Sequence, residues 1–193
     1  NGDGTFTKNE TEVPATDQSW SYGCAFGDYD NDGFEDLAVA TVAFNGIDTP
    51  DFLYHNNGNA NHWITIKLVG TTTNKSAIGT KIRVKATING VSVWQMREIS
   101  AQTSYNGQND LRAHFGLGNA DSVETIRVEW LSGLEEIYGN ISSNQFISIV
   151  EGQGILGMNS MEANTITTIH PNPVTSILNI DLKSGNEIKT GGI

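Results

Sequence analysis

The acidic run between Gly27 and Asp36 constrains the fold of this chain more than any other segment. Four aspartates fall within nine residues, grouped around one glycine: Asp28, Asp30, Asp32 and Asp36, with Gly33 among them. Carboxylates this close repel one another, and a hard divalent cation that accepts six to eight oxygen ligands at about 2.3–2.6 Å offsets that repulsion. The spacing therefore predicts a calcium loop, completed by the backbone carbonyl of Phe34, in which Gly33 permits the sharp bend.

The residues after the loop predict a strand and not a helix. An EF-hand loop continues to a bidentate glutamate at its twelfth position and then into a helix. Here the twelfth position is Val39, and Leu37–Val42 is a short, apolar, partly β-branched run that is typical of a buried strand. The sequence thus predicts a metal loop between two strands. The alternative is an acidic turn without a metal ion, which the D-x-D-x-D-G-x-x-D spacing disfavours.

The segment Phe26–Leu37 resembles the F-G-D-Y-D-N-D-G-x-x-D-L signature of FG-GAP/VCBS repeats, the blade units of integrin-type β-propellers. The first residues, Asn1–Phe6, resemble the hairpin that closes such a repeat, and Asn56–Asn59 resembles a degenerate second copy. The resemblance implies that residues 1–60 are a fragment of a propeller, whose blades have four short strands each. One blade cannot bury its own faces, so we expect the chain to be part of a longer protein.

Residues 61–151 show a different pattern of longer strands with alternating apolar residues. The apolar positions are Ile64, Ile66 and Leu68, then Ile82, Val84, Ala86 and Ile88, then Ile126, Val128 and Trp130. The expected turns are Asn89-Gly90, Ser132-Gly133 and Gly139-Asn140, and Phe146, Ile147 and Ile149 would form the last strand, ending at Glu151. Half-buried strands of this kind predict an antiparallel β-sandwich or a barrel-like domain.

This second block resembles the ASPIC/UnbV domain. The resemblance rests on short motifs at His62–Ile64, Ile78–Lys81, Gln95–Glu98, Ser104–Asp110, His114–Gly118 and Val128–Gly133. Leu131 stands where the family usually has proline, which alters a turn and not the assignment. The resemblance implies a domain that follows FG-GAP repeats near the end of secreted proteins, and it implies no reaction.

Polar residues between Arg97 and His114 are the candidates for contact with a ligand: Arg97, Glu98, Tyr105, Gln108, Asn109, Asp110 and His114, with Arg112 among them. Such a segment could hydrogen-bond a sugar or a peptide, with Tyr105 as a stacking surface. The alternative is that these side chains satisfy the backbone of a long connection. Ser104, Asp110 and His114 include the residue types of a hydrolytic triad, but no G-x-S-x-G nucleophile elbow is present, so we predict no catalytic residues.

Composition limits the partners of the chain. The formal net charge is −11 and the 11 Lys and Arg residues are scattered, which argues against a nucleic-acid partner because phosphate binding needs clustered cations. No apolar stretch approaches the ~20 residues of a membrane-spanning helix. The single cysteine, Cys24, excludes an internal disulfide, and its surroundings predict a small apolar strand residue.

Residues 152–164 lack periodicity and predict a linker, and residues 165–193 resemble the start of the C-terminal sorting domain of the type IX secretion system. That resemblance rests on Pro171, Asn172, Pro173, Leu178, Asn179 and Ile180, with His170 in place of the usual aromatic residue. It implies an Ig-like domain recognised by the secretion machinery at the outer membrane. Since such domains usually continue for several more strands, we expect this one to be incomplete.

Together these patterns predict an all-β, non-enzymatic module that binds calcium and serves recognition or adhesion in a secreted or surface-attached bacterial protein. Its expected partner is an extracellular glycan or protein. An alternative is an accessory C-terminal module of a secreted enzyme whose catalytic domain lies upstream. A third hypothesis, a biosynthetic role, fits the sorting motif poorly.

Overall fold

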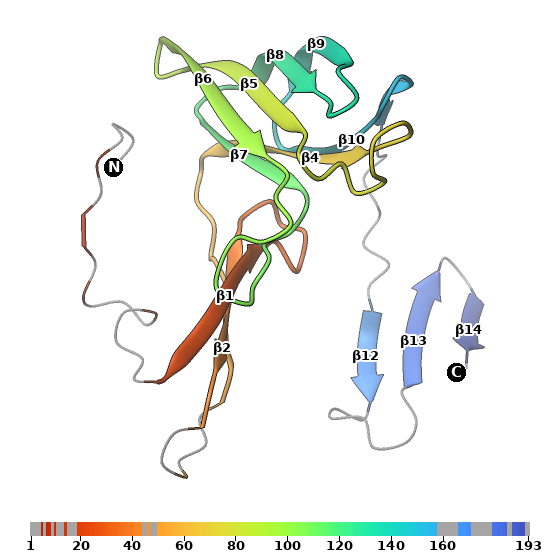
Figure 1. The fold of residues 1–193 in the computed structure, drawn as a ribbon. Coiled ribbons are helices and arrows are strands. Elements are labelled where there is room, and N and C mark those ends of the chain that lie inside the picture. The colour runs from red at the N-terminus through yellow and green to blue at the C-terminus, as the bar shows by residue number, and fades with distance from the viewer. Residues whose placement is uncertain are drawn as a thin grey trace. The chain divides into compact units, whose positions relative to one another are not determined.

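In the computed structural model, the regular elements that can be described are all strands, which confirms the expected all-β class (Figure 1). The structure describes residues 5, 7, 8, 10, 14, 19–43, 46 and 50–157, together with the backbone of the strands at 166–170, 179–184 and 187–191. Within this part of the chain, no helix is long and apolar enough to cross a membrane.

The acidic loop lies in a three-stranded antiparallel sheet. Strands β1 (Ser21–Gly27), β2 (Asp36–Thr41) and β3 (Phe52–Tyr54) are ordered β1-β2-β3, and the loop connects β1 to β2. The strand predicted after the loop is confirmed by β2, and Cys24 lies in β1 as expected. Most of the segment Asn1–Phe6, expected to form a hairpin, lies outside the described residues.

Two four-stranded sheets follow. The first is ordered β11-β10-β4-β7 and contains β4 (His62–Val69), β7 (Ala113–Gly118), β10 (Gln145–Val150) and β11 (Gly154–Gly157). The second is ordered β6-β5-β8-β9 and contains β5 (Lys81–Ile88), β6 (Val91–Glu98), β8 (Ser122–Glu129) and β9 (Glu135–Ser142).

Both four-stranded sheets contribute to one hydrophobic core, so the domain is a sandwich and the described strands close no barrel. Most of the apolar positions that the alternation predicts are buried in this core, because successive residues of a strand point to opposite faces. They include Ile64, Ile66 and Leu68 from β4, Ile82, Val84 and Ala86 from β5, and Ile126 and Val128 from β8. Phe115 and Leu117 from β7, which the alternation did not identify, are buried as well.

The expectation of a purely antiparallel sandwich is wrong for one pair of strands. β10 pairs with β4 in parallel, with Ile147 opposite Ile66 and Ile149 opposite Leu68. The pairings of β4 with β7, of β5 with β6 and β8, and of β8 with β9 are antiparallel. Alternation fixes which face of a strand is buried, and it carries no information on the direction of the neighbouring strand.

The expected turns have different outcomes. Asn89-Gly90 forms a two-residue hairpin between β5 and β6, with φ angles of 50° and 78°, as a type I′ turn requires. Gly139-Asn140 forms no turn, because both residues lie inside β9. Asn140 has a φ of 56°, so the strand absorbs a left-handed residue, and the chain turns later, at Ser143-Asn144.

The sandwich also extends past its expected end. β11 lies within the segment predicted as a linker, 152–164, and adds an edge strand beyond Glu151. Residues Asn1–Leu156 form one compact unit, so the β1–β3 sheet and the sandwich belong together. The domain boundary expected near residue 60 stays a prediction, because compactness alone does not test where one family domain ends and the next begins.

The second compact unit, Gly157–Ile193, contains a three-stranded antiparallel sheet. Its strands are β12 (Ile166–His170), β13 (Asn179–Ser184) and β14 (Glu187–Gly191), ordered β12-β13-β14. Of the predicted sorting motif, Asn179 and Ile180 begin β13, whereas Pro171, Asn172, Pro173 and Leu178 lie outside the described residues. Three strands do not establish an Ig-like domain.

Candidate metal centre

The loop from Asp28 to Asp36, hereafter the metal loop, folds around two buried carboxylates. The residues Asp28 and Asp36 are only 3% and 2% exposed. The Asp28 carboxylate accepts hydrogen bonds from the backbone amides of Asp32 (3.1 Å) and Gly33 (2.8 Å). The Asp36 carboxylate accepts hydrogen bonds from the amides of Tyr29 (3.2 Å) and Asn56 (2.7 Å). These bonds draw the backbone around the two carboxylates and so shape the loop.

Three of the predicted ligands converge. One carboxylate oxygen from each of Asp28, Asp30 and Asp36 lies within 4.8 Å of the others. The salt bridges found among the described residues include none to Asp28 or Asp36, although burying like charges without a counter-charge is costly. An all-oxygen donor set with this charge fits a hard divalent cation.

The pKa values in and beside the metal loop reflect this concentration of negative charge. Burial raises the pKa of Asp28, and the backbone hydrogen bond from Gly33 and the charge of Arg112 only partly oppose it. Burial, together with the charges of Asp110 and Asp28, raises the pKa of Glu35 to about 7. A bound cation would lower both values, because it favours the charged carboxylate.

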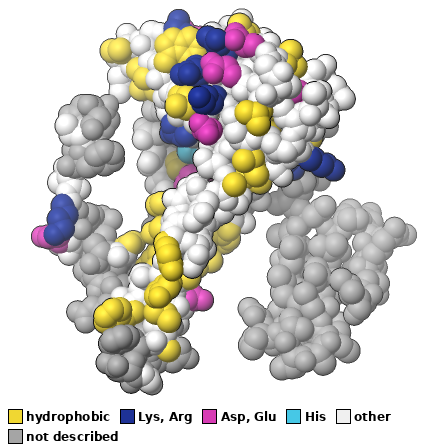
Figure 2. Space-filling model, viewed as in Figure 1, with side chains coloured by type: hydrophobic (Ala, Val, Ile, Leu, Met, Phe, Trp, Pro, Cys, Tyr) yellow, Lys and Arg dark blue, Asp and Glu magenta, His cyan; other side chains and the backbone are white. Residues whose placement is uncertain are grey.

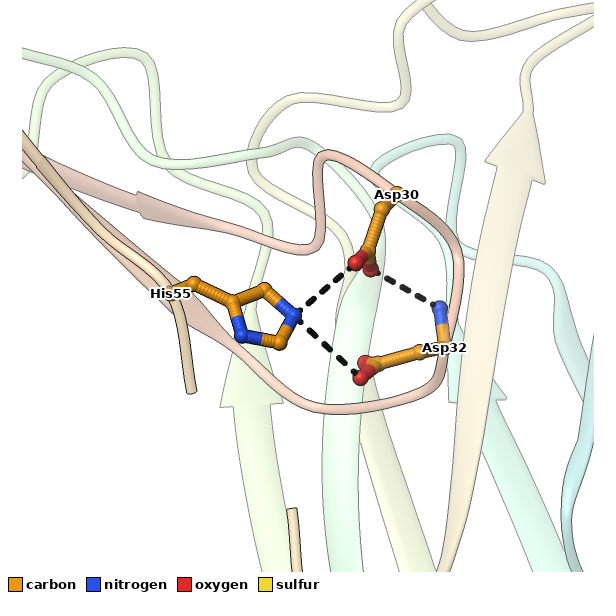
Figure 3. A group of neighbouring side chains, drawn as sticks. All are labelled: Asp30, Asp32 and His55. Carbon is orange, nitrogen blue, oxygen red and sulfur yellow. Dashed lines mark hydrogen bonds and ion pairs between the residues drawn. The ribbon is translucent and has the colours of Figure 1, made fainter. Parts of the chain in front are cut away.

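A second donor set adds an imidazole that the sequence analysis missed (Figure 3). Nε2 of His55 lies 2.9 Å from Oδ2 of Asp30 and 3.8 Å from Oδ2 of Asp32. The hydrogen bond with Asp30 is the main cause that raises the pKa of His55. His55 directly follows β3. Because Tyr54 of β3 pairs with Leu37, His55 lies near the first residues of β2, where the metal loop ends. Only strand pairing brings it there, so no local pattern could have identified it.

The segment Asn56–Asn59, which resembles a degenerate second copy of the repeat, closes over the metal loop. The side chain of Asn56 donates to the Glu35 carbonyl (3.2 Å), and a Cβ at Gly58 would lie 2.8 Å from the Phe34 ring. The amide of Phe34 donates to the Asp32 carboxylate (2.8 Å). These contacts hold Phe34 in the metal loop, and its carbonyl stays a predicted ligand.

The metal loop packs directly on the sandwich. A Cβ at Gly33, which has a φ of 93°, would lie 1.8 Å from Cε2 of Trp63, so only glycine fits against this indole. The Arg112 guanidinium donates to the carbonyl of Asp28 (2.7 Å) and to the side chain of Asn31 (2.7 Å). It also lies over the Phe146 ring, 5.3 Å from the ring centroid. These contacts hold the metal loop against the beginning of β4.

Part of the predicted ligand-contacting cluster is used in the same docking. The Asn109 side chain accepts a hydrogen bond from the Phe26 amide (2.9 Å), and the Asp110 amide donates to the Phe26 carbonyl (2.8 Å). The Ser104 hydroxyl donates to the Cys24 carbonyl (2.7 Å). Residues 103–112, hereafter the docking loop, thus satisfy the free edge of β1, which favours the structural alternative for Asn109 and Asp110.

Tyr105 and Gln108 remain exposed on the docking loop. The Tyr105 ring is 65% exposed and meets the Tyr22 ring of β1 edge to face, with the centroids 5.6 Å apart. This aromatic pair combines one side chain from the β1–β3 sheet with one from the docking loop. Of the predicted cluster, Tyr105 and Gln108 thus remain exposed, as do Arg97 and Glu98.

Arg97, Glu98 and His114 do not join this surface. Arg97 and Glu98 end β6, and the Arg97 guanidinium lies 5.2 Å from the centroid of the Phe115 ring. His114 contacts the Thr65 hydroxyl (3.2 Å) and stacks on Trp63, and burial lowers its pKa, with the Arg97 charge adding to the effect. Ser104, Asp110 and His114 each bond elsewhere and form no triad.

The outer face of the second sheet carries a feature that the sequence analysis did not anticipate. A shallow cavity of about 430 Å³ is lined by Arg83, Trp94, Gln95, Met96 and Arg127. Arg83 and Arg127 form ion pairs with Glu129 and Glu135, and Figure 2 shows basic and acidic side chains side by side on this part of the molecule. The face is therefore charge-balanced around an exposed tryptophan.

Comparison with known families agrees with two of the three resemblances. The family described as ASPIC and UnbV matches residues 70–156, and the family described as FG-GAP-like repeat matches residues 1–39. No curated protein matches the chain. The ASPIC and UnbV match includes most of β11 and ends where the first compact unit ends. Both are typically non-catalytic modules that are common in extracellular proteins, and the FG-GAP match, which covers β1 and the first residues of β2, suggests a propeller-like β-fold.

Proposed function

We propose that this chain is a calcium-binding recognition module of a secreted or cell-surface protein. Its ligands would be the carboxylates of Asp28, Asp30, Asp32 and Asp36 and the carbonyl of Phe34. The observation that carries the proposal is the burial of Asp28 and Asp36 beside Asp30, without a salt bridge to either buried carboxylate among the described residues. A divalent cation bound there would neutralise the loop and fix the positions of its oxygen ligands.

Calcium fits this donor set better than magnesium does. The loop offers several carboxylates and a carbonyl on an irregular backbone, and calcium accepts six to eight oxygens in flexible geometry. Magnesium requires a nearly ideal octahedron at about 2.0–2.1 Å and keeps several waters. Extracellular modules also tolerate weak calcium sites, with dissociation constants of roughly 10⁻⁴–10⁻³ M.

Thermal unfolding of the full chain across a calcium titration tests the metal proposal. We expect the melting temperature to rise and saturate with calcium, and to rise much less with magnesium at the same concentrations. Asp36→Asn should remove the rise, because Asp36 is buried in the loop, whereas Asp121→Asn should keep it, because the Asp121 side chain is 93% exposed elsewhere. A calcium response that persists in the Asp36→Asn protein would contradict the assignment.

Recognition is proposed at the exposed pair Tyr22 and Tyr105, with Gln108 beside them in the docking loop. Aromatic side chains with a polar group are common in protein recognition surfaces, and this pair combines a residue of β1 with a residue of the docking loop. The expected partner is a glycan or a protein. Binding to a glycan array should require calcium and should be lost in Tyr105→Ser but kept in Trp94→Ser. Loss of binding in Trp94→Ser, with binding kept in Tyr105→Ser, would place recognition at the cavity beside Trp94.

Export by the type IX system is proposed on the sequence motif alone. Pro171→Ala combined with Pro173→Ala, in the full chain expressed in a host with this system, should reduce the secreted fraction and leave total expression unchanged. Equal secretion of the unchanged protein and the double variant would count against the sorting role.

A further inference from the structure

His55 gives the metal loop a nitrogen donor that the calcium proposal does not use. One imidazole nitrogen faces two carboxylates at once, as Figure 3 shows, with Nε2 2.9 Å from Asp30 and 3.8 Å from Asp32. The donors come from two separate parts of the β1–β3 sheet, the loop before β2 and the residue after β3. Hard cations such as calcium select oxygen, whereas imidazole is a preferred ligand of zinc and of later transition metals.

The spacing of these donors suits a small tetrahedral ion. Bonds of about 2.0–2.1 Å, as zinc forms with imidazole and carboxylate, place neighbouring ligands of a tetrahedron about 3.3–3.4 Å apart. The two measured separations, 2.9 and 3.8 Å, lie on either side of that value. Small rotations of the exposed carboxylates would therefore make the two separations equal without moving the backbone.

The imidazole is also held in place by a neighbouring ring. The Tyr29 ring meets it edge to face, with the centroids 5.9 Å apart. A fixed orientation favours metal binding, since metal-binding histidines are usually positioned by neighbouring groups. Asp30, Asp32 and His55 are all exposed, which leaves a fourth coordination position open to water.

We propose that Asp30, Asp32 and His55 bind a divalent ion of the zinc class. This site differs from the proposed calcium set because it uses the exposed imidazole of His55 and leaves out the buried Asp28 and Asp36. Asp30 and Asp32 belong to both proposed ligand sets, so zinc and calcium compete for the loop. The zinc site stands without the calcium proposal, and only the competition rests on it.

The experiment measures zinc and calcium binding to the untagged full chain by titration calorimetry, with cobalt absorption as a second readout of tetrahedral coordination. His55→Gln should weaken zinc binding by about tenfold or more and leave calcium binding unchanged. The matched control is His62→Gln, since His62 also has a carboxylate within reach, 3.4 Å away, but only one. His62→Gln should leave zinc affinity unchanged.

The outcomes separate the two metal proposals. Asp36→Asn should abolish calcium binding and preserve zinc binding, and saturating calcium should weaken the zinc affinity of the unchanged protein. Equal zinc affinity in the His55→Gln and unchanged proteins would overturn the zinc site, whatever calcium does. Loss of zinc binding in the His62→Gln protein would also overturn it, because the ion would then be bound elsewhere.

Discussion

The β1–β3 sheet and the sandwich belong to one compact unit, yet they are stabilised in different ways. The sandwich buries a continuous apolar core built from both of its sheets. In the described parts of residues 19–60, by contrast, the only buried residues are Asp28, Gly33 and Asp36. Apolar burial is the main favourable term in folding, so the sandwich has its own source of stability and the β1–β3 sheet depends on polar contacts and on docking.

The same contrast holds for the buried carboxylates of the two regions. Burial by itself would raise the pKa of Glu151, but hydrogen bonds from Ser132 and from the amides of Thr71, Thr72 and Thr73 lower it to about 2. The pKa of Asp28 is instead raised by burial. The sandwich supplies enough hydrogen-bond donors to favour the ionised form of the buried Glu151. In the metal loop the donors do not offset the effect of burial on Asp28, and a bound cation would do so.

The largest effect should come from truncating the core of the sandwich. Ile126→Ala removes a fully buried side chain of β8 and should lower the free energy of unfolding by about 2–5 kcal/mol. Ile137→Ala, on the neighbouring strand, removes the same atoms from a residue that is 64% exposed and should change it by less than about 0.5 kcal/mol. Chemical denaturation measures both. Equal losses would mean that the sandwich does not draw its stability from this core.

The next effect concerns the contact between the two regions. Gly33→Ala places a Cβ against Trp63 at a positive φ, and should cost about 2–4 kcal/mol and weaken calcium binding. Gly90→Ala is the matched control, since Gly90 has a φ of 78° and no atom within 4 Å of the added Cβ. It should cost about 1–2 kcal/mol from backbone strain alone. Similar losses in both proteins would show that close packing on Trp63 is unimportant.

A smaller effect should appear on acidification. Because the folded pKa of Glu151 lies below its ordinary value, its contribution is complete above about pH 4.5 and is lost as the pH falls toward 2. We expect roughly 2–3 kcal/mol of stability to disappear over this window. Glu151→Gln should be less stable at pH 7 and should lack this part of the acid dependence. Parallel stability curves for the two proteins would refute the role of Glu151.

The smallest effect should follow from loosening the docking without a clash. Arg112→Gln removes the bonds to the Asp28 carbonyl and to Asn31, and should cost about 1–2 kcal/mol and speed hydrogen exchange in the metal loop. Arg97→Gln is the control, because the hydrogen bond found for Arg97 goes to the adjacent Met96 carbonyl. If hydrogen-exchange rates in the metal loop are unchanged in the Arg112→Gln protein, the stability of the loop does not depend on the docking contacts of Arg112.

Sequence alone gave correct expectations where the information is local. Alternation identified the buried faces at Ile64, Val84 and Ile126, and the spacing of the aspartates identified a cluster that the fold does bring together. The parallel entry of β10, the approach of His55 and the contacts of Arg112 depend on strand pairing between residues far apart in the chain. Nothing in the neighbouring residues encodes those pairings, so they could not be predicted.

The position of Trp63 should let its fluorescence report changes in the metal loop. The indole lies against Gly33 and next to Phe146, with centroids 4.9 Å apart. Of the other three tryptophans, Trp20 and Trp94 are largely exposed, and Trp130 is buried with its indole nitrogen bonded to Glu136. Intrinsic fluorescence that responds to a metal ion should therefore come mainly from Trp63, and occupancy can be followed without any attached dye.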